Sequence, residues 1–142
     1  MIQVALKGKG LVMGVAEGKA LVSRRAFTFA HGVDPATGRV TDIRSDIRGA
    51  TVKGKVLFYP FGNGSTAGSS WFLETVRLGN QPLAIVTEGV DLSAVIGSIL
   101  ANLIYGKGIP VIAGVSTSSC AQVMSGIEVS LDANTGEVRA ED

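Results

Sequence analysis

The residues best suited to chemistry lie in one loop, Phe61-Gly62-Asn63-Gly64-Ser65-Thr66-Ala67-Gly68-Ser69-Ser70. Three glycines and four hydroxyl side chains fall within residues 62–70. An apolar run at 56–59 precedes the loop and a helix-like run at 71–78 follows it. A loop between a strand and a helix presents backbone N–H groups and hydroxyls to a ligand. It can hold an anion, or aim a serine at one.

Two known phosphate motifs do not match this loop. A P-loop needs a lysine beside the hydroxyl residue at the helix start, and residues 67–70 contain none. The glycines at 62, 64 and 68 also miss the spacing of a dinucleotide-binding fingerprint. A tight turn whose serines only cap the helix therefore stays an equal alternative from spacing alone.

The other candidates give weaker signals. His31 is the only histidine, and without a neighbouring Ser or Cys it is more typical of a structural residue, while Asp34 is expected to cap the Asp-Pro turn that follows. Cys120 is the only cysteine, so it forms no internal disulfide or metal cluster, and we expect it in a loop or a partly buried position. Arg24 and Arg25 could meet an anionic substrate, but such a pair is usually solvated surface.

Composition predicts one cytoplasmic domain over residues 1–142. Hydrophobic residues make up 46% of the chain and charged residues 18%, so part of the surface is expected to lie against another molecule. The net charge is only +1 and the Lys and Arg residues are scattered along the chain, which argues against a nucleic-acid partner. No signal peptide is visible, and the most apolar window, 92–104, is too short to span a bilayer, so no membrane partner is expected.

Periodicity predicts strands first and then alternating strands and helices. A helix over 69–78 is expected to begin at Ser69 or Ser70 as N-cap, with Gly79 just past its end. A second helix over 91–105 is capped by Asp91 or Ser93 and ended by Gly106. One face of that helix carries Val95, Ile96, Ile99, Leu100, Leu103 and Ile104. Strands are predicted over 2–6, 11–15, 19–22, 51–60, 83–87 and 110–115, a turn over 34–38, and a closing hairpin over 127–131 and 137–139. This order predicts an α/β fold, a mixed sheet or open barrel with two main helices.

The ordered set of motifs resembles a known family, the small subunit or swivel domain of the aconitase X proteins. The resemblance covers roughly residues 10 to 115 and rests on the segments 14–23, 31–38, 54–57, 62–69 and 106–111. It implies a swivelling β/β/α domain that forms a heterodimer with a much larger subunit. It also implies a dehydratase whose iron centre or iron–sulfur cluster lies in that large subunit, with no cofactor bound by this chain alone.

The resemblance assigns roles to the glycine loop. It implies that Ser65 is the base, with Gly64, Thr66, Gly68 and Ser69 completing the loop around a hydroxy-acid substrate. A serine is a poor base unless N–H donors or positive charge stabilise its alkoxide, and such a loop supplies N–H donors.

One branch of the family dehydrates cis-3-hydroxy-L-proline and another mevalonate 5-phosphate. Many members carry a basic residue where Asn63 stands, and Asn63 donates hydrogen bonds without charge. Together with the segment 105–110, this favours the hydroxyproline substrate.

Two alternatives come from other functional classes. The chain could be a regulatory module that binds an anion through the loop without chemistry. It could also be a swivelling phosphotransfer domain with His31 as carrier, but Ala30 precedes His31 where such carriers have a Thr or Ser.

Overall fold

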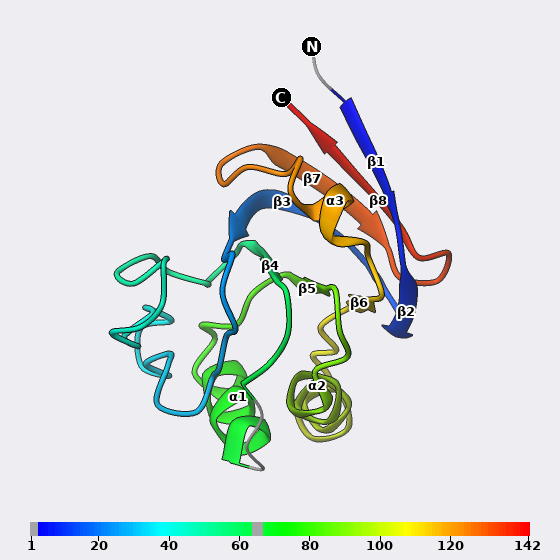
Figure 1. Ribbon diagram of the computed structural model, residues 1–142. Helices are drawn as coiled ribbons and strands as arrows, with labels where there is room; N and C mark the ends of the chain where they lie inside the picture. The colour runs from blue at the N-terminus through cyan, green and yellow to red at the C-terminus, as the bar shows by residue number, and fades with distance from the viewer. Residues whose placement is uncertain (1–2, 64–66) are drawn as a thin grey trace.

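The computed structural model describes residues 3–63 and 67–142, which form one open, strongly curved mixed sheet with its two long helices on one side (Figure 1). The strands are β1 (Gln3–Lys7), β2 (Lys9–Val12), β3 (Val15–Val22), β4 (Val56–Tyr59), β5 (Ala84–Thr87), β6 (Val111–Ala113), β7 (Glu128–Asp132) and β8 (Glu137–Glu141). The helices of this part of the chain are α1 (Ala67–Arg77), α2 (Leu92–Tyr105) and the short α3 (Thr117–Cys120).

The sheet has the order β1-β8-β7-β3-β4-β5-β6-β2. Strands β3, β4, β5 and β6 run parallel, while β1, β8, β7 and the β2 edge pair antiparallel. A single glycine, Gly8, joins β1 to β2, and these strands form the two edges of the sheet. The predicted mixed sheet is therefore confirmed in its open form.

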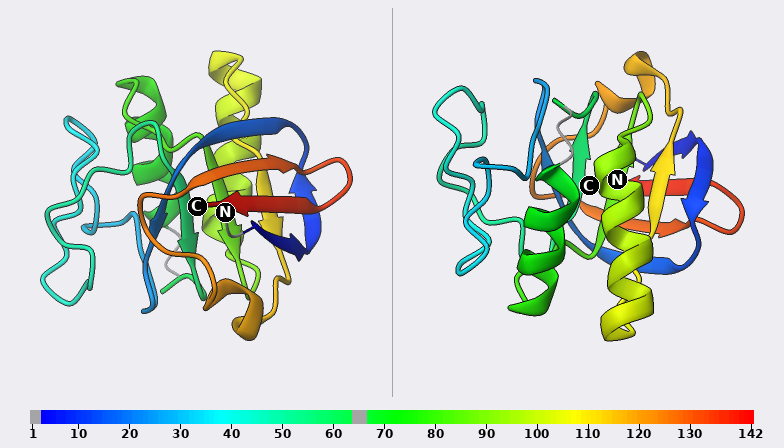
Figure 2. Two further views of the ribbon diagram at one scale, coloured as in Figure 1. Left: turned by 90° about the horizontal axis from the view of Figure 1, so that it is seen from above. Right: turned by 90° about the horizontal axis from the view of Figure 1, so that it is seen from below.

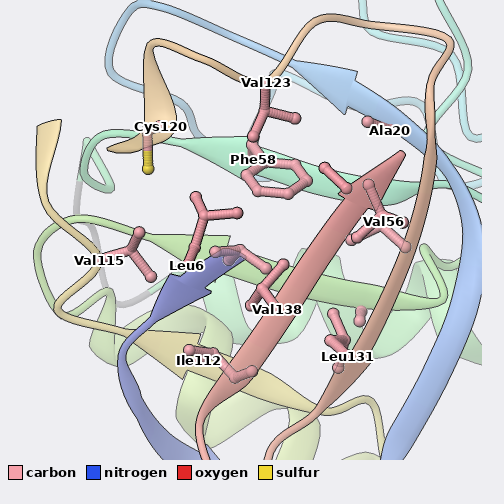
Figure 3. Close-up of a cluster of buried hydrophobic side chains, with 14 of the residues drawn as sticks. Leu6, Ala20, Val56, Phe58, Ile112, Val115, Cys120, Val123, Leu131 and Val138 are labelled. Carbon is pink, nitrogen blue, oxygen red and sulfur yellow. The ribbon is translucent and has the colours of Figure 1, made fainter. Parts of the chain in front are cut away.

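Alternation along the parallel strands divides the interior into two cores. In β4, Val56 and Phe58 face the antiparallel layer, whereas Leu57 and Tyr59 face the helices. The first core lies between the curved antiparallel strands and the parallel strands, with Leu6, Phe58, Ile112 and Val138 at its centre (Figure 3). Antiparallel strands, parallel strands and helices thus form three layers, the β/β/α arrangement.

Both main helices end as their sequences predict. In α1, the N–H of Gly79 donates to the carbonyl of Val76 and that of Asn80 to the carbonyl of Thr75, with Gly79 at a positive φ of 77°. This pattern is a Schellman motif. In α2, Asp91 is the N-cap and accepts from the N–H of Ser93, and Gly106 caps the other end at φ 67°.

The start of α1 differs from the prediction. The helix already includes Ala67, so Ser69 and Ser70 lie inside its first turn and do not cap it. The Ser69 hydroxyl instead donates to the carbonyl of Ser93, which ties α1 to α2.

Helix α2 packs through its small residues. Its buried side is formed by Ala94, Gly97, Ser98 and Ala101. A Cβ built on Gly97 would lie 2.7 Å from the ring of Phe72, and the Ser98 hydroxyl both donates to and accepts from the backbone of Ile109. The apolar face predicted from periodicity is largely exposed. Its exposed members are Ile96, Ile99, Leu103 and Ile104.

Three shorter segments also differ from the predicted elements. The strand expected over 51–60 is confined to Val56–Tyr59, because a turn with Gly54 at φ 70° precedes it. Gly14, at φ 137°, separates β2 from β3, so the run expected over 11–15 is split between them. The region around Cys120 is the short helix α3 rather than a loop, and Cys120 is buried.

The close contact at Gly97 gives a stability prediction. We expect Gly97→Val to lower the free energy of unfolding by about 1–3 kcal/mol, because the added atoms meet the rigid, fully buried ring of Phe72. Asn102→Val adds the same side chain at an exposed position of α2 and serves as the control. Urea unfolding followed by circular dichroism measures both, and an equal loss in the two variants would contradict the packing argument.

Candidate active site at the carboxyl edge of the sheet

The loops that follow the parallel strands meet at one edge of the sheet, where open α/β sheets usually bind ligands. The glycine loop follows β4, the segment 88–91 follows β5, and 114–116 follows β6. The N–H groups of Glu88 and Gly89 donate to the carbonyl of Pro60 at 3.1 and 2.9 Å, and that of Gly114 donates to the carbonyl of Glu88 at 3.0 Å. The chain is thus fixed to the neighbouring loop at Pro60, the residue just before the glycine loop.

Half of the predicted site residues can be placed. Asn63 is exposed, and its backbone N–H donates to the carbonyl of Phe27 at 2.9 Å. Gly68 is buried in the first turn of α1, where an added Cβ would lie 2.9 Å from the Cβ of Ser93. Ser69 is half-buried, and its hydroxyl donates to the carbonyl of Ser93 at 3.0 Å. The predictions for Gly64, Ser65 and Thr66 lie outside the described residues.

A buried carboxylate, Asp91, stands behind the loop. One of its oxygens accepts from the Tyr59 hydroxyl at 2.6 Å, and the other accepts from the N–H of Ser93 at 3.1 Å. A Cβ built on Gly62 would lie 2.4–2.6 Å from the Asp91 carboxyl group. Only glycine therefore fits at position 62, because the carboxylate occupies the space that a side chain would need.

Tyr59 is held in its neutral form. Burial is the largest cause, and the negative charge and hydrogen bond of Asp91 add to it, so the pKa of Tyr59 lies well above its ordinary value of 10.0. Tyr59 therefore acts here as a fixed hydrogen-bond donor. A shallow hollow beside the pair is lined by residues 27–29, Asn63, Gly68, Asp91 and Ser93.

A larger pocket of about 250 Å³ lies beside the same edge, lined in part by Val22 and Phe58 of the first core. The Arg24 guanidinium donates to the carbonyls of Cys120 and Val123 at 2.8 and 2.6 Å. Arg24 thus supports the end of α3 and is not the simply solvated residue that the sequence suggested. The Thr117 hydroxyl donates to the Glu88 carboxylate across the pocket.

Neither His31 nor Asp34 lies in these pockets. The ring centroids of His31 and Trp71 are 4.5 Å apart, and His31 has a positive φ of 57° in an exposed turn. The Asp34 carboxylate accepts from the N–H of Ala36 at 2.9 Å, which confirms its predicted role in the turn.

The described residues do not fit an iron centre or iron–sulfur cluster. Over residues 3–63 and 67–142, no group of three or more His, Cys, Asp or Glu side chains is close enough to hold a metal ion. Within the same ranges, no helix is long and apolar enough to cross a bilayer.

Sequence reasoning missed the pairing of Tyr59 with Asp91. The two residues are 32 positions apart, and Asp91 was identified only as a helix cap. The available signal was the parallel sheet itself, because Tyr59 ends one strand and Asp91 follows the next, so both belong at one edge.

Known proteins share both the sequence and the fold of this chain. The family described as the aconitase X swivel domain matches residues 5–140. A protein named phosphomevalonate dehydratase small subunit from Pyrococcus furiosus is 42% identical over 133 residues, covering 94% of this chain and 92% of its own length. The protein of the same name from Thermococcus sibiricus is 42% identical over 137 residues, covering 96% of this chain and 98% of its own length.

Solved structures give the same result. The crystal structure of Thermococcus kodakaraensis aconitase X in its holo-form matches with a TM-score of 0.87 and 38% identity, over 97% of this chain and 98% of that chain. The solution NMR structure of a UPF0107 protein matches with a TM-score of 0.85 and 29% identity, over 98% of this chain and 100% of that chain.

A three-layer swivelling domain with a glycine loop at its carboxyl edge defines the class. The chain belongs to the aconitase X swivel-domain family, and it is a small subunit of an aconitase X-type dehydratase.

The Tyr59–Asp91 pair gives a second prediction. Tyr59→Phe should lower the free energy of unfolding by about 1–3 kcal/mol, because the buried Asp91 carboxylate loses a hydrogen-bond donor. Above pH 10 Tyr59 loses its proton readily only in the unfolded chain, and this ionisation stabilises the unfolded wild type. The difference in the free energy of unfolding between the wild type and Tyr59→Phe should therefore shrink as the pH rises past 10. Urea unfolding between pH 7 and 11 measures this, with Tyr105→Phe as the exposed control. A difference that stays constant with pH would contradict the assignment.

Cys120 gives a third prediction. Burial, and secondarily the charge of Glu88, raise the pKa of its thiol from 9.0 to about 11, while the charge of Arg24 acts to lower it. The rate of alkylation by iodoacetamide should therefore rise to half its maximum near pH 11 in the folded chain, and near pH 9 in urea. Glu88→Gln should move the folded midpoint downward by removing one of the two raising causes. A folded midpoint near pH 9 would be inconsistent with a buried thiol.

Proposed function

We propose that this chain is the small subunit of a cytoplasmic mevalonate 5-phosphate dehydratase. The observation that carries the proposal is its 42% identity, over nearly the whole length of both chains, to relatives named phosphomevalonate dehydratase small subunit. A third such relative, from Methanosarcina acetivorans, is 36% identical over 103 residues. These names favour mevalonate 5-phosphate as the substrate. The expectation of cis-3-hydroxy-L-proline rests only on the uncharged Asn63 and the segment 105–110.

In this proposal Ser65 is the base of the reaction. It takes a proton from the substrate carbon next to the one that bears the hydroxyl group. The C–H electron pair forms the new C=C bond as the hydroxyl leaves, and the proton and hydroxyl together make one water. In the sequence, Ser65 comes two positions before Ala67, the first residue of α1, and the N-terminal end of a helix dipole stabilises a nearby negative charge such as an alkoxide.

The large subunit completes the site in this proposal. The described residues of this chain provide no set of iron ligands, so the iron centre or cluster is assigned to the large subunit, where it would act as a Lewis acid. Asn63, Gly68 and Ser69, with the loop residues Gly64 and Thr66, are proposed to border the substrate. Since base and iron belong to different chains, neither chain alone should convert substrate.

Co-expression with the large subunit tests both parts of the proposal. The purified complex should release water from mevalonate 5-phosphate with a kcat/KM at least tenfold above that for cis-3-hydroxy-L-proline, as followed by mass spectrometry of the products. The opposite preference would reject the substrate assignment without affecting the family.

Ser65→Ala should lower kcat by about 10²–10⁴-fold with little change in KM, because a positioned base contributes that much to a rate. Ser70→Ala is the matched control, since Ser70 is exposed in the first turn of α1 and has no assigned role. Full activity of an intact Ser65→Ala complex would remove Ser65 from the mechanism.

A further inference from the structure

Helix α2 presents its largest apolar side chains to solvent. Leu92, Ile96, Ile99 and Leu103 are 65%, 46%, 45% and 76% exposed, and we call these four residues the α2 outer face. The small residues Ala94, Gly97 and Ala101 occupy the inner side, so the helix is turned opposite to an ordinary surface helix. Its 14 residues include no charged side chain.

The outer face has the geometry of a packing seam. Its members are spaced by four, three and four residues, the spacing of apolar positions in helices that pack on a partner. Ile104 and Tyr105, at the end of the helix, are also 57% and 36% exposed, but they lie on other sides of the helix. Figure 2 (right) shows α2 beside α1 on the outside of the helical layer, with the sheet behind them. Exposed apolar surface of this extent typically marks a protein interface.

The outer face is continuous with the candidate active site. Leu92 directly follows Asp91, whose carboxylate lies against Gly62 of the glycine loop. Phe61 and Val90, on the two loops joined through Pro60, are 56% and 58% exposed. A molecule that covers the first turn of α2 therefore also borders the glycine loop.

We propose that the α2 outer face is the docking surface for the large subunit. This inference rests on the proposed function, which places the rest of the active site on that subunit. A second copy of this chain on the same surface would close the edge where the substrate must enter, whereas the large subunit has to lie there. The partner surface must be apolar, because α2 offers no charge to pair with.

Binding of the purified large subunit by variants of this chain tests the inference. Leu103→Glu and Ile99→Glu should each weaken the dissociation constant by about tenfold or more, because a charge is buried against an apolar surface. Ile43→Glu is the matched control and should change the constant less than twofold. Ile43 is also 76% exposed, and its segment 41–50 lies on the far side of α1 from α2 (Figure 1). Isothermal titration calorimetry measures the constants.

Each outcome decides the inference separately from the proposed function. Wild-type affinity of Leu103→Glu overturns the inference, even if the complex dehydrates mevalonate 5-phosphate. Weakened binding supports it, even if that substrate proves wrong. Self-association of the small subunit that Leu103→Glu abolishes without affecting large-subunit binding would identify a second copy as the occupant and also overturn it.

A second measurement avoids dependence on the folding of the glutamate variants. Amide hydrogen exchange over residues 99–105 of the wild-type chain should slow in the complex, while exchange over 41–50 should stay unchanged. Equal exchange over 99–105 in the free chain and the complex would overturn the inference.

Discussion

The candidate site depends on the position of one carboxylate, Asp91. It caps α2, accepts the hydroxyl of Tyr59 at the end of β4, and fills the space beside Gly62. A strand, a helix and the glycine loop are therefore positioned by the same side chain. Because Asp91 is nearly inaccessible to solvent, its bonds to Tyr59 and Ser93 are made where an unpaired charge would be costly. The described residues at the start of the glycine loop are thus held by the side chain that caps α2.

The strands beneath this site give it a rigid base. All residues of β4 and β5 are buried, since the antiparallel layer covers one face of these strands and the helices cover the other. Strands covered on both faces have near-continuous apolar sequences, as these do. Residues that directly follow such strands are fixed at their first peptide groups, as Pro60 and Glu88 are.

Local signals predicted most of the fold, and failures arose where distant residues decide the packing. Alternation and turn residues located β5, the closing hairpin and the C-terminal ends of α1 and α2, because these depend on neighbours in sequence. Helix periodicity found α2 and its apolar face but not which face is buried, since that depends on Phe72 approaching Gly97. In the candidate site, the glycine loop was visible in the sequence. The contact of Asp91 with Tyr59 and Gly62 was not, because it joins two separate loops.

The pairing of β1 with β8 has a consequence for how such a domain can be joined to other chains. Gln3 lies opposite Glu141 in this pair, so the first and last described strands run side by side and their outer ends point the same way (Figure 1). The loops of the candidate site follow other strands, β4, β5 and β6. A covalent linker attached at either end would therefore begin beside the other end, on strands that the loops of the candidate site do not follow. The same strand pairing is compatible with a separate subunit and with a domain inside a longer chain.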